Sequence, residues 1–189
     1  MITRRMRYSF AIALLGLAWG TLRAQEAWDN ADRDTRRLAP SMFRGLPASV
    51  RADLARRGCT VPQVWYDTVP GNVISGRFRT TKQTDWAVLC SVNRVSSILV
   101  YWNGQPDSVA EVASAADKNY LQGVGGGRIG FSRAIATVDA PFIRRNSQGF
   151  GGPTPPPLDH EGINDAFVEK ASSVWYWHEG KWLRLTGVD

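Results

Sequence analysis

The groups best suited to acid–base or metal chemistry stand together at Asp159-His160-Glu161, followed closely by Asp165 and Glu169. Imidazole and carboxylate groups can ligate a divalent ion, and two carboxylates can act as general acid and base in hydrolysis. Adjacent residues of an extended chain point to opposite sides, so the three neighbours cannot all reach one ion. Asp159 and Glu161 can share a face, which leaves acid–base chemistry as the enzymatic interpretation.

The same residues end a proline-rich segment that spans residues 146–162. Three consecutive prolines favour an extended backbone without ladder hydrogen bonds, so we predict an ordered or semi-rigid loop. In one interpretation the polar residues only hold this loop by hydrogen bonds to backbone amides. In the other, the stiff loop is a binding site, because it loses little freedom on binding. The candidate binding residues are Pro155, Pro156, Pro157, Asp159, His160 and Glu161.

Two further motifs lack the context that their chemistry needs. Residues 125–130 satisfy G-x-G-x-x-G, but a dinucleotide site needs a strand before it, a helix after it and a later acidic residue. Ser132 lies in a near match to the nucleophile elbow, which belongs to a larger parallel sheet. We interpret these as a flexible turn and a strand serine, and we predict no catalytic residue, metal ion or cofactor.

The N-terminus has the pattern of a secretory signal peptide, with arginines before an apolar run and Ala24 at the expected cleavage position. A membrane anchor is the alternative, but roughly 11 apolar residues fall short of the ~20 that span a bilayer. We therefore expect residues 1–24 to be removed. The mature protein would then lie in the bacterial periplasm or be secreted, without a membrane span.

Loss of residues 1–24 also changes the charge. The whole chain carries +6, but this segment holds four arginines and no acidic residue, so the mature charge is +2. The remaining arginine pairs are scattered along the sequence. We therefore predict no nucleic-acid binding.

Cys59 and Cys90 are the only cysteines of the chain. An oxidising compartment favours a disulfide between them. The alternative is a catalytic Cys90 with His160 as its base, which requires Cys59 to stay reduced. We predict the disulfide.

A small, turn-rich domain must position these groups. The chain has 189 residues, of which 11% are aromatic, with 18 glycines and 10 prolines, as expected for one globular domain with many turns. Residues 25–45 are polar and aperiodic, so we expect a loose leader. Residues 46–58 predict one amphipathic helix, ending at a glycine. Its solvated face carries Arg51, Arg56 and Arg57.

Short apolar runs after residue 61 predict strands at 85–91, 97–102, 108–113 and 129–138, with a hairpin turn at Asn103-Gly104. The segment SSILVYWNG (96–104) aligns without a gap with SSVWYWHEG (172–180). Similar segments, beginning at Asp85 and Asp165, precede the two copies. We interpret this as a duplicated meander with equivalent central strands, and chance similarity of two apolar hairpins as the alternative.

Trp175, Trp177 and Trp182 cluster near the second copy. Residues 175 and 177 share one face of a strand. That face is either part of the core or a platform on which a sugar could stack, and we favour the core.

The stretch GRFRTTKQTDWAVLC, with Gly76, Phe78, Asp85, Ala87 and Val88, resembles the blade pattern of FG-GAP-type β-propeller repeats. In those repeats Gly-x-Phe leads across a turn into Asp-x-Ala-Val, and alternating aspartates in the turn bind calcium. The turn here reads TTKQT and has no carboxylate, so the calcium site should be missing. Two blade-like copies also cannot close a propeller ring.

The combination of RGCTVPQ, QTDWAVLCS, IGFSRAI, GGPTPPPLDHEGI and GKWLRLTGVD resembles a family of small exported bacterial proteins of uncharacterised function. The resemblance covers most of the mature chain. It implies an exported bacterial protein with paired cysteines, and it implies no activity or catalytic residue.

We predict an α+β fold, mostly an antiparallel β-meander with a blade-like repeat and one N-terminal helix, in a single domain over residues 46–189. For function we favour an exported, non-catalytic binding or inhibitor-like protein of the bacterial cell envelope, with an envelope protein or glycan as partner. The alternative is a small hydrolase acting on cell-wall or glycan material through Asp159, His160 and Glu161. If these side chains converge in a pocket, the enzyme is favoured. If the surface carries an aromatic patch instead, the binding protein is favoured.

The signal-peptide interpretation predicts a mature N-terminus at Gln25. N-terminal sequencing of exported material checks this directly. An intact Met1 in the soluble exported fraction would contradict both the cleavage and the corrected charge.

Overall fold

The computed structural model describes residues 25–188, so the predicted signal peptide lies outside the described residues. Within these residues, twelve strands form four antiparallel sheets, which confirms a strand-rich α+β fold. No helix among the described residues is long and apolar enough to cross a membrane.

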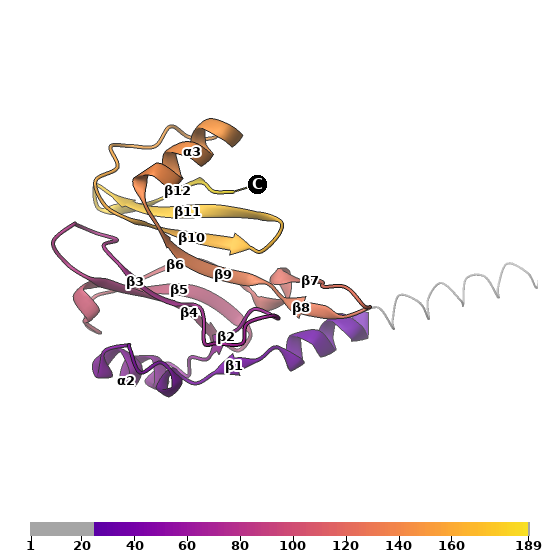
Figure 1. Cartoon of the computed structure of the whole chain (residues 1–189). Coiled ribbons are helices and arrows are strands. Elements are labelled where there is room, and N and C mark those ends of the chain that lie inside the picture. Colours follow the sequence, from indigo (N-terminus) through magenta and orange to yellow (C-terminus); the bar gives the residue numbers. More distant parts are fainter. Residues whose placement is uncertain (1–24, 189) are drawn as a thin grey trace, which may run out of the picture.

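Two four-stranded meanders form the body of the molecule (Figure 1). In each, the strands pair in chain order. The first contains β3 (Val73–Gly76), β4 (Asp85–Val92), β5 (Val95–Tyr101) and β6 (Val109–Ala116). The second contains β9 (Arg133–Val138), β10 (Gly162–Phe167), β11 (Ala171–His178) and β12 (Lys181–Thr186).

The sheets stack in the middle of four layers, with one helix on each outer face (Figure 1). Apolar side chains from both sheets fill the space between them, among them Leu89, Ile98 and Ile163. α2 (Ala48–Arg56) covers the outer face of the first sheet, and α3 (Ala140–Phe150) covers the second. The strand predicted at 97–102 is therefore buried on both faces, as expected.

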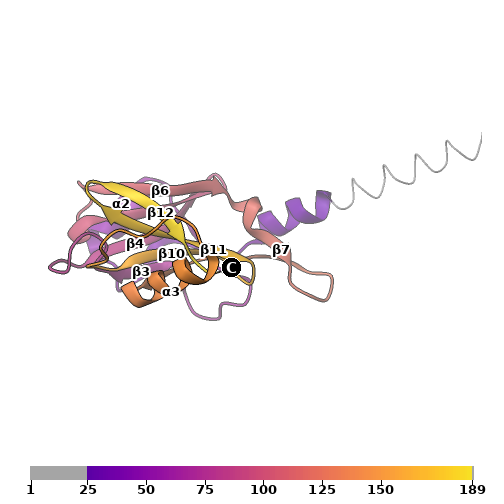
Figure 2. The same ribbon diagram turned by 90° about the horizontal axis from the view of Figure 1, so that it is seen from above.

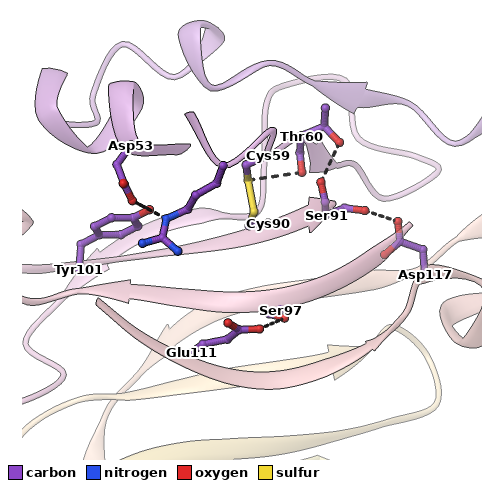
Figure 3. The surroundings of a disulfide bond; sticks show 10 residues. Asp53, Cys59, Thr60, Cys90, Ser91, Ser97, Tyr101, Glu111 and Asp117 are labelled. Atoms are coloured by element: carbon purple, nitrogen blue, oxygen red, sulfur yellow. Dashed lines mark hydrogen bonds and ion pairs between the residues drawn. A yellow bond between two sulfur atoms is a disulfide. The ribbon is translucent and has the colours of Figure 1, made fainter. Parts of the chain in front are cut away.

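The predicted helix and disulfide are both present. α2 follows Pro47, buries Val50 and Leu54, and is followed by Gly58 at a φ of 70°. Cys59 then bonds to Cys90 of β4, with the two Cα atoms 5.4 Å apart (Figure 3). The disulfide thus attaches the end of α2 to the first sheet.

A buried carboxylate also holds α2 (Figure 3). Asp53 accepts hydrogen bonds from the Tyr101 hydroxyl at 3.0 Å and from Arg57 Nε at 2.6 Å, and it pairs with Arg56. Burial by itself raises the pKa of Asp53, but these hydrogen bonds and the two positive charges outweigh it and leave the pKa below its usual value. Arg56 and Arg57 are therefore ion-pair partners as well as a solvated face.

Residues 25–45 differ from the expected loose leader. They form a helix over 25–34, the short strand β1 (Arg37–Leu38) and the 3-10 helix η1 (Pro40–Met42). β1 pairs with β2 (Val61–Pro62), and Arg37 forms ion pairs with Asp32 and the buried Asp117. Long-range contacts order this segment, and local sequence patterns do not reveal such contacts.

The expected strand over 129–138 is two strands in two sheets. β8 (Ile129–Phe131) pairs with β7 (Leu121–Gly123), and β9 begins after Ser132. The first residues of the predicted proline loop belong instead to α3, whose N-cap Asp139 accepts a hydrogen bond from the Phe142 amide at 2.9 Å. Short 3-10 helices follow β5 (η2, Trp102–Gly104) and β6 (η3, Asp117–Tyr120).

The two copies of the repeat occupy equivalent places, since β5 and β11 are each the third strand of a meander. Both strands lead into a pair of residues with positive φ, Asn103-Gly104 and Glu179-Gly180. The aspartates before the copies are not equivalent. Asp85 begins β4, whereas Asp165 lies within β10, so only the central strands and their turns match.

The Gly-x-Phe…Asp pattern has a structural explanation. A Cβ at Gly76 would lie 2.6 Å from the Phe78 ring, so glycine gives that buried ring its space. Asp85 is fully buried and accepts hydrogen bonds from the amides of Phe78 and Arg79 at 3.1 Å and of Asn103 at 2.8 Å. The motif thus folds the turn between β3 and β4.

Arg133 is fully buried and links the two sheets. It forms two 2.8 Å bonds to Asp165 of β10 and donates to the carbonyl groups of Ser96 and Ala113 on β5 and β6. Its guanidinium also lies 4.5 Å from the centre of the Tyr120 ring. All parts of this side chain therefore have partners.

The variant Arg133→Met should lower the free energy of unfolding by about 3–5 kcal/mol, because it leaves the buried Asp165 without its cation. Urea unfolding measures the loss. The double variant Arg133→Met/Asp165→Leu should recover part of it. A single variant as stable as the wild type would show that the ion pair does not hold the sheets together.

Candidate functional site

The predicted polar site lies between α3 and the start of β10, and its residues attach the loop to the protein. The His160 ring stacks on Tyr176 of β11, with ring centres 4.3 Å apart. The Tyr176 oxygen accepts from the Asp159 amide at 3.0 Å and donates to the Asp159 carboxylate at 3.1 Å. Glu161 accepts from the Arg77 amide at 2.7 Å. Asp159 and His160 thus both contact Tyr176, with His160 Nε2 3.7 Å from Asp159 Oδ1, whereas Glu161 is held by a different group.

The prolines occupy a separate position. Pro155 and Pro156 line a shallow hollow of about 420 Å³ against α3, together with Arg144 and Gln148. Asp159, His160 and Glu161 do not line this hollow. Among the described residues, no group of three metal-ligating side chains comes together. The structure therefore favours the loop-holding interpretation of Asp159 and His160 over convergent acid–base or metal chemistry.

A different loop presents apolar side chains to solvent. Residues 63–71, between β2 and β3, form what we call the aromatic loop. Its exposed fractions are 38% for Trp65, 48% for Tyr66 and 70% for Val69. Large apolar groups exposed together on one short loop indicate a binding surface.

Two buried amides hold the base of the aromatic loop. The Gln63 side chain accepts from the Gly71 amide at 2.7 Å and donates to the Val61 and Gly71 carbonyls. Asn72, at a φ of 64°, donates to the carbonyls of Pro62 and Arg133 and accepts from the Ile135 amide at 3.0 Å. Because both side chains are more than nine-tenths buried, the loop ends are fixed.

Trp65 is fixed by the hairpin of β7 and β8. Its amide donates to the Phe131 carbonyl at 2.9 Å, and a Cβ at Gly130 would lie 2.5 Å from the Trp65 Cβ. The Arg128 guanidinium lies over the indole at 5.6 Å, and Tyr66 meets its edge at a centroid distance of 5.3 Å. Burial, with the charges of Asp67 and Glu169, raises the pKa of Tyr66, so its hydroxyl is neutral at physiological pH.

Helix 25–34 and the β7–β8 hairpin lie at the same end of the molecule (Figure 2). They border, together with the aromatic loop, a groove of about 460 Å³. Ala27, Ala31 and Asp34 line it from the helix, and Arg128 and Ile129 from the hairpin. The aromatic loop is thus part of a larger concave surface.

Sequence analysis did not identify this loop. The signal was the sequence QVWYDTVPG, in which adjacent aromatic residues stand between short apolar runs and turn residues. The residue types alone do not tell that Trp65 and Tyr66 are exposed, because tryptophan and tyrosine are also common in protein cores. Glycine at 130, whose absent side chain makes room for Trp65, is distant in the sequence.

The tryptophans of the second copy are partly buried and pack against the core, as we favoured, and Trp175 also borders a cleft. Trp177 and Trp182 pack on Trp102, with ring centres 5.2 and 5.5 Å from it, between the sheets. The sugar-stacking alternative requires an open ring face. Trp102 instead covers both rings.

Comparison of the chain with protein-family models, with curated proteins and with solved structures finds no match.

The variant Tyr176→Phe keeps the ring that stacks on His160 and removes the hydroxyl that holds Asp159. We expect a loss of about 1–2 kcal/mol in stability and faster proteolytic cleavage within residues 151–161, measured by urea unfolding and limited proteolysis. Tyr66→Phe, which removes a largely exposed hydroxyl, is the matched control and should change neither. Equal protease resistance in both variants would contradict a loop-holding role for Tyr176.

Proposed function

We propose that this protein is an exported, non-catalytic binding or inhibitor-like protein of the bacterial cell envelope. The observation that carries the proposal is the aromatic loop, whose exposed Trp65, Tyr66 and Val69 stand on a base fixed by buried amides. Tryptophan, tyrosine and arginine contribute most of the binding energy in many protein interfaces, and this surface combines all three. A disulfide is also in keeping with an oxidising compartment.

The rigidity of the loop supports binding rather than a purely structural role. A loop that is ordered before binding avoids the entropy cost of being ordered by the partner. Burying Tyr66 and Val69 in the core would stabilise the fold, yet both remain exposed. Buried amides that hold exposed apolar groups in place are the arrangement expected of a recognition loop.

A protein partner fits this surface better than a glycan. Sugar rings stack on open aromatic faces, but Arg128 lies over the Trp65 ring and the hairpin backbone at Gly130 packs against its base. The adjoining groove of about 460 Å³ offers apolar and charged walls that side chains of a protein can enter. We therefore favour an envelope protein as partner.

The alternative of a hydrolase acting through Asp159, His160 and Glu161 receives no support from their positions. Acid–base catalysis needs two such groups facing one substrate position. Here Asp159 is held by Tyr176 and Glu161 by the Arg77 amide.

The double variant Tyr66→Ala/Val69→Ser should reduce partner capture from envelope extract at least tenfold, because it removes the exposed apolar groups without touching the buried base. Phe150→Ala, at a side chain of similar exposure on α3, is the matched control and should capture normally. Quantitative mass spectrometry of the captured proteins measures the difference. Each variant is compared only if its melting temperature equals that of the wild type, so that a loss of capture is not a loss of folding.

The variant Asp159→Ala/His160→Ala tests the proline loop in the same assay. Suppose that Tyr66→Ala/Val69→Ser captures partners normally and that only Asp159→Ala/His160→Ala loses capture. The binding site would then lie at residues 155–161, and the assignment to the aromatic loop would be overturned.

A further inference from the structure

The space between the two sheets is not completely filled. A cleft of about 440 Å³ lies between β6 and the β11–β12 side of the second sheet. On β6 only the small residues Ala113, Ser114 and Ala115 border it, whereas Trp175 and Phe167 border it from the second sheet. The cleft exists because small side chains stand where larger ones would close the sandwich.

The floor of the cleft is rigid. Asp165 lines it and is held by two bonds from the buried Arg133. The Ala113 carbonyl accepts from Arg133 at 2.6 Å, at a residue with a φ of 57°. Tyr120, also in the lining, lies under the same guanidinium. The walls are therefore fixed before any ligand arrives.

One cation in the cleft lacks an acidic partner. Arg184 of β12 donates from Nε to the Ser173 hydroxyl at 2.9 Å. Arg184 is exposed to solvent and forms no ion pair within residues 25–188, and the acid that borders the cleft, Asp165, is paired with Arg133. The lining thus offers one guanidinium, the Ser173 hydroxyl and aromatic side chains.

We propose that this cleft binds an aromatic carboxylate. The carboxylate pairs with Arg184, and the Ser173 hydroxyl, which borders the cleft beside Arg184, can donate to it. The aromatic body lies between Trp175 and the small residues of β6. The volume suits a ring system of one or two rings, because ligand pockets of roughly 300–1,000 Å³ hold small organic molecules.

Two sources can supply this chemistry: a free aromatic acid, or the C-terminal carboxylate of a peptide that ends in an aromatic residue. Both present a planar anion a few bonds from a ring. The site uses β6, β11 and β12, whereas the aromatic loop lies between β2 and β3, so the proposal is independent of the proposed function.

The test is a nitrogen-15 NMR titration of the purified protein with indole-3-acetate, and in parallel with N-acetyl-Ala-Phe. We expect shifts of the Trp175 indole N–H and of the amides of residues 113–115. The neutral analogue indole-3-ethanol and amide-capped N-acetyl-Ala-Phe should bind at least tenfold more weakly. Tighter binding of the free acid or of the peptide identifies the source.

Two variants of β12 test whether Arg184 is the cation that binds the carboxylate. Arg184→Gln should weaken binding by roughly ten- to a hundredfold, the effect of losing a charged hydrogen bond. Lys181→Gln makes the same charge change on β12 outside the cleft lining and should bind normally. Ala115→Phe, which fills the cleft, should abolish the shifts.

Absence of shifts at Trp175 and residues 113–115 with both probes would overturn the proposal. Equal weakening by Arg184→Gln and Lys181→Gln would also overturn it, because binding would then reflect overall charge. The melting temperature of each variant separates loss of binding from loss of folding.

Discussion

The buried ion pair between Arg133 and Asp165 is the constraint on which the rest of the structure depends. A guanidinium removed from water must have nearly all its donors satisfied, and the required acceptors come from β5, β6 and β10. Both sheets are therefore fixed relative to each other at one residue. The Arg133 carbonyl also accepts from Asn72, which holds the end of the aromatic loop. The sheet interface, the aromatic loop and the inter-sheet cleft are thus all connected to Arg133.

Other buried carboxylates have the same connecting role. Asp53 joins α2 to β5, Asp85 folds the turn before β4, and Asp117 accepts from Ser91 and Arg37 to attach the N-terminal segment. Each satisfies donors that burial would otherwise leave without a partner, as interiors require. These buried acidic residues therefore hold elements of the fold together.

The proline segment and the aromatic loop are both held by specific contacts, but the contacts fix different kinds of side chain. The proline segment is attached to the protein through its polar groups, which Tyr176 and the Arg77 backbone hold, although the Asp159 side chain itself is largely exposed. The aromatic loop is held at its base by Gln63 and Asn72, and its apolar side chains are exposed to solvent. The groups that are fixed therefore differ: polar groups attach the first loop, and buried amides hold exposed apolar groups in the second.

By itself the sequence determined the features that depend on local patterns or on a single possible pairing. These are the helix predicted within 46–58, the strands predicted at 85–91 and 97–102, the positive φ of Asn103-Gly104 and the Cys59–Cys90 disulfide. Only the tertiary structure decided that Arg133 is buried, that residues 25–45 are ordered, and that Trp65 and Tyr66 are exposed. The physical reason is that burial of a charged or aromatic side chain depends on partners distant in the chain. Asp165 is 32 positions from Arg133, and Gly130, which makes room for Trp65, is still further from it along the chain.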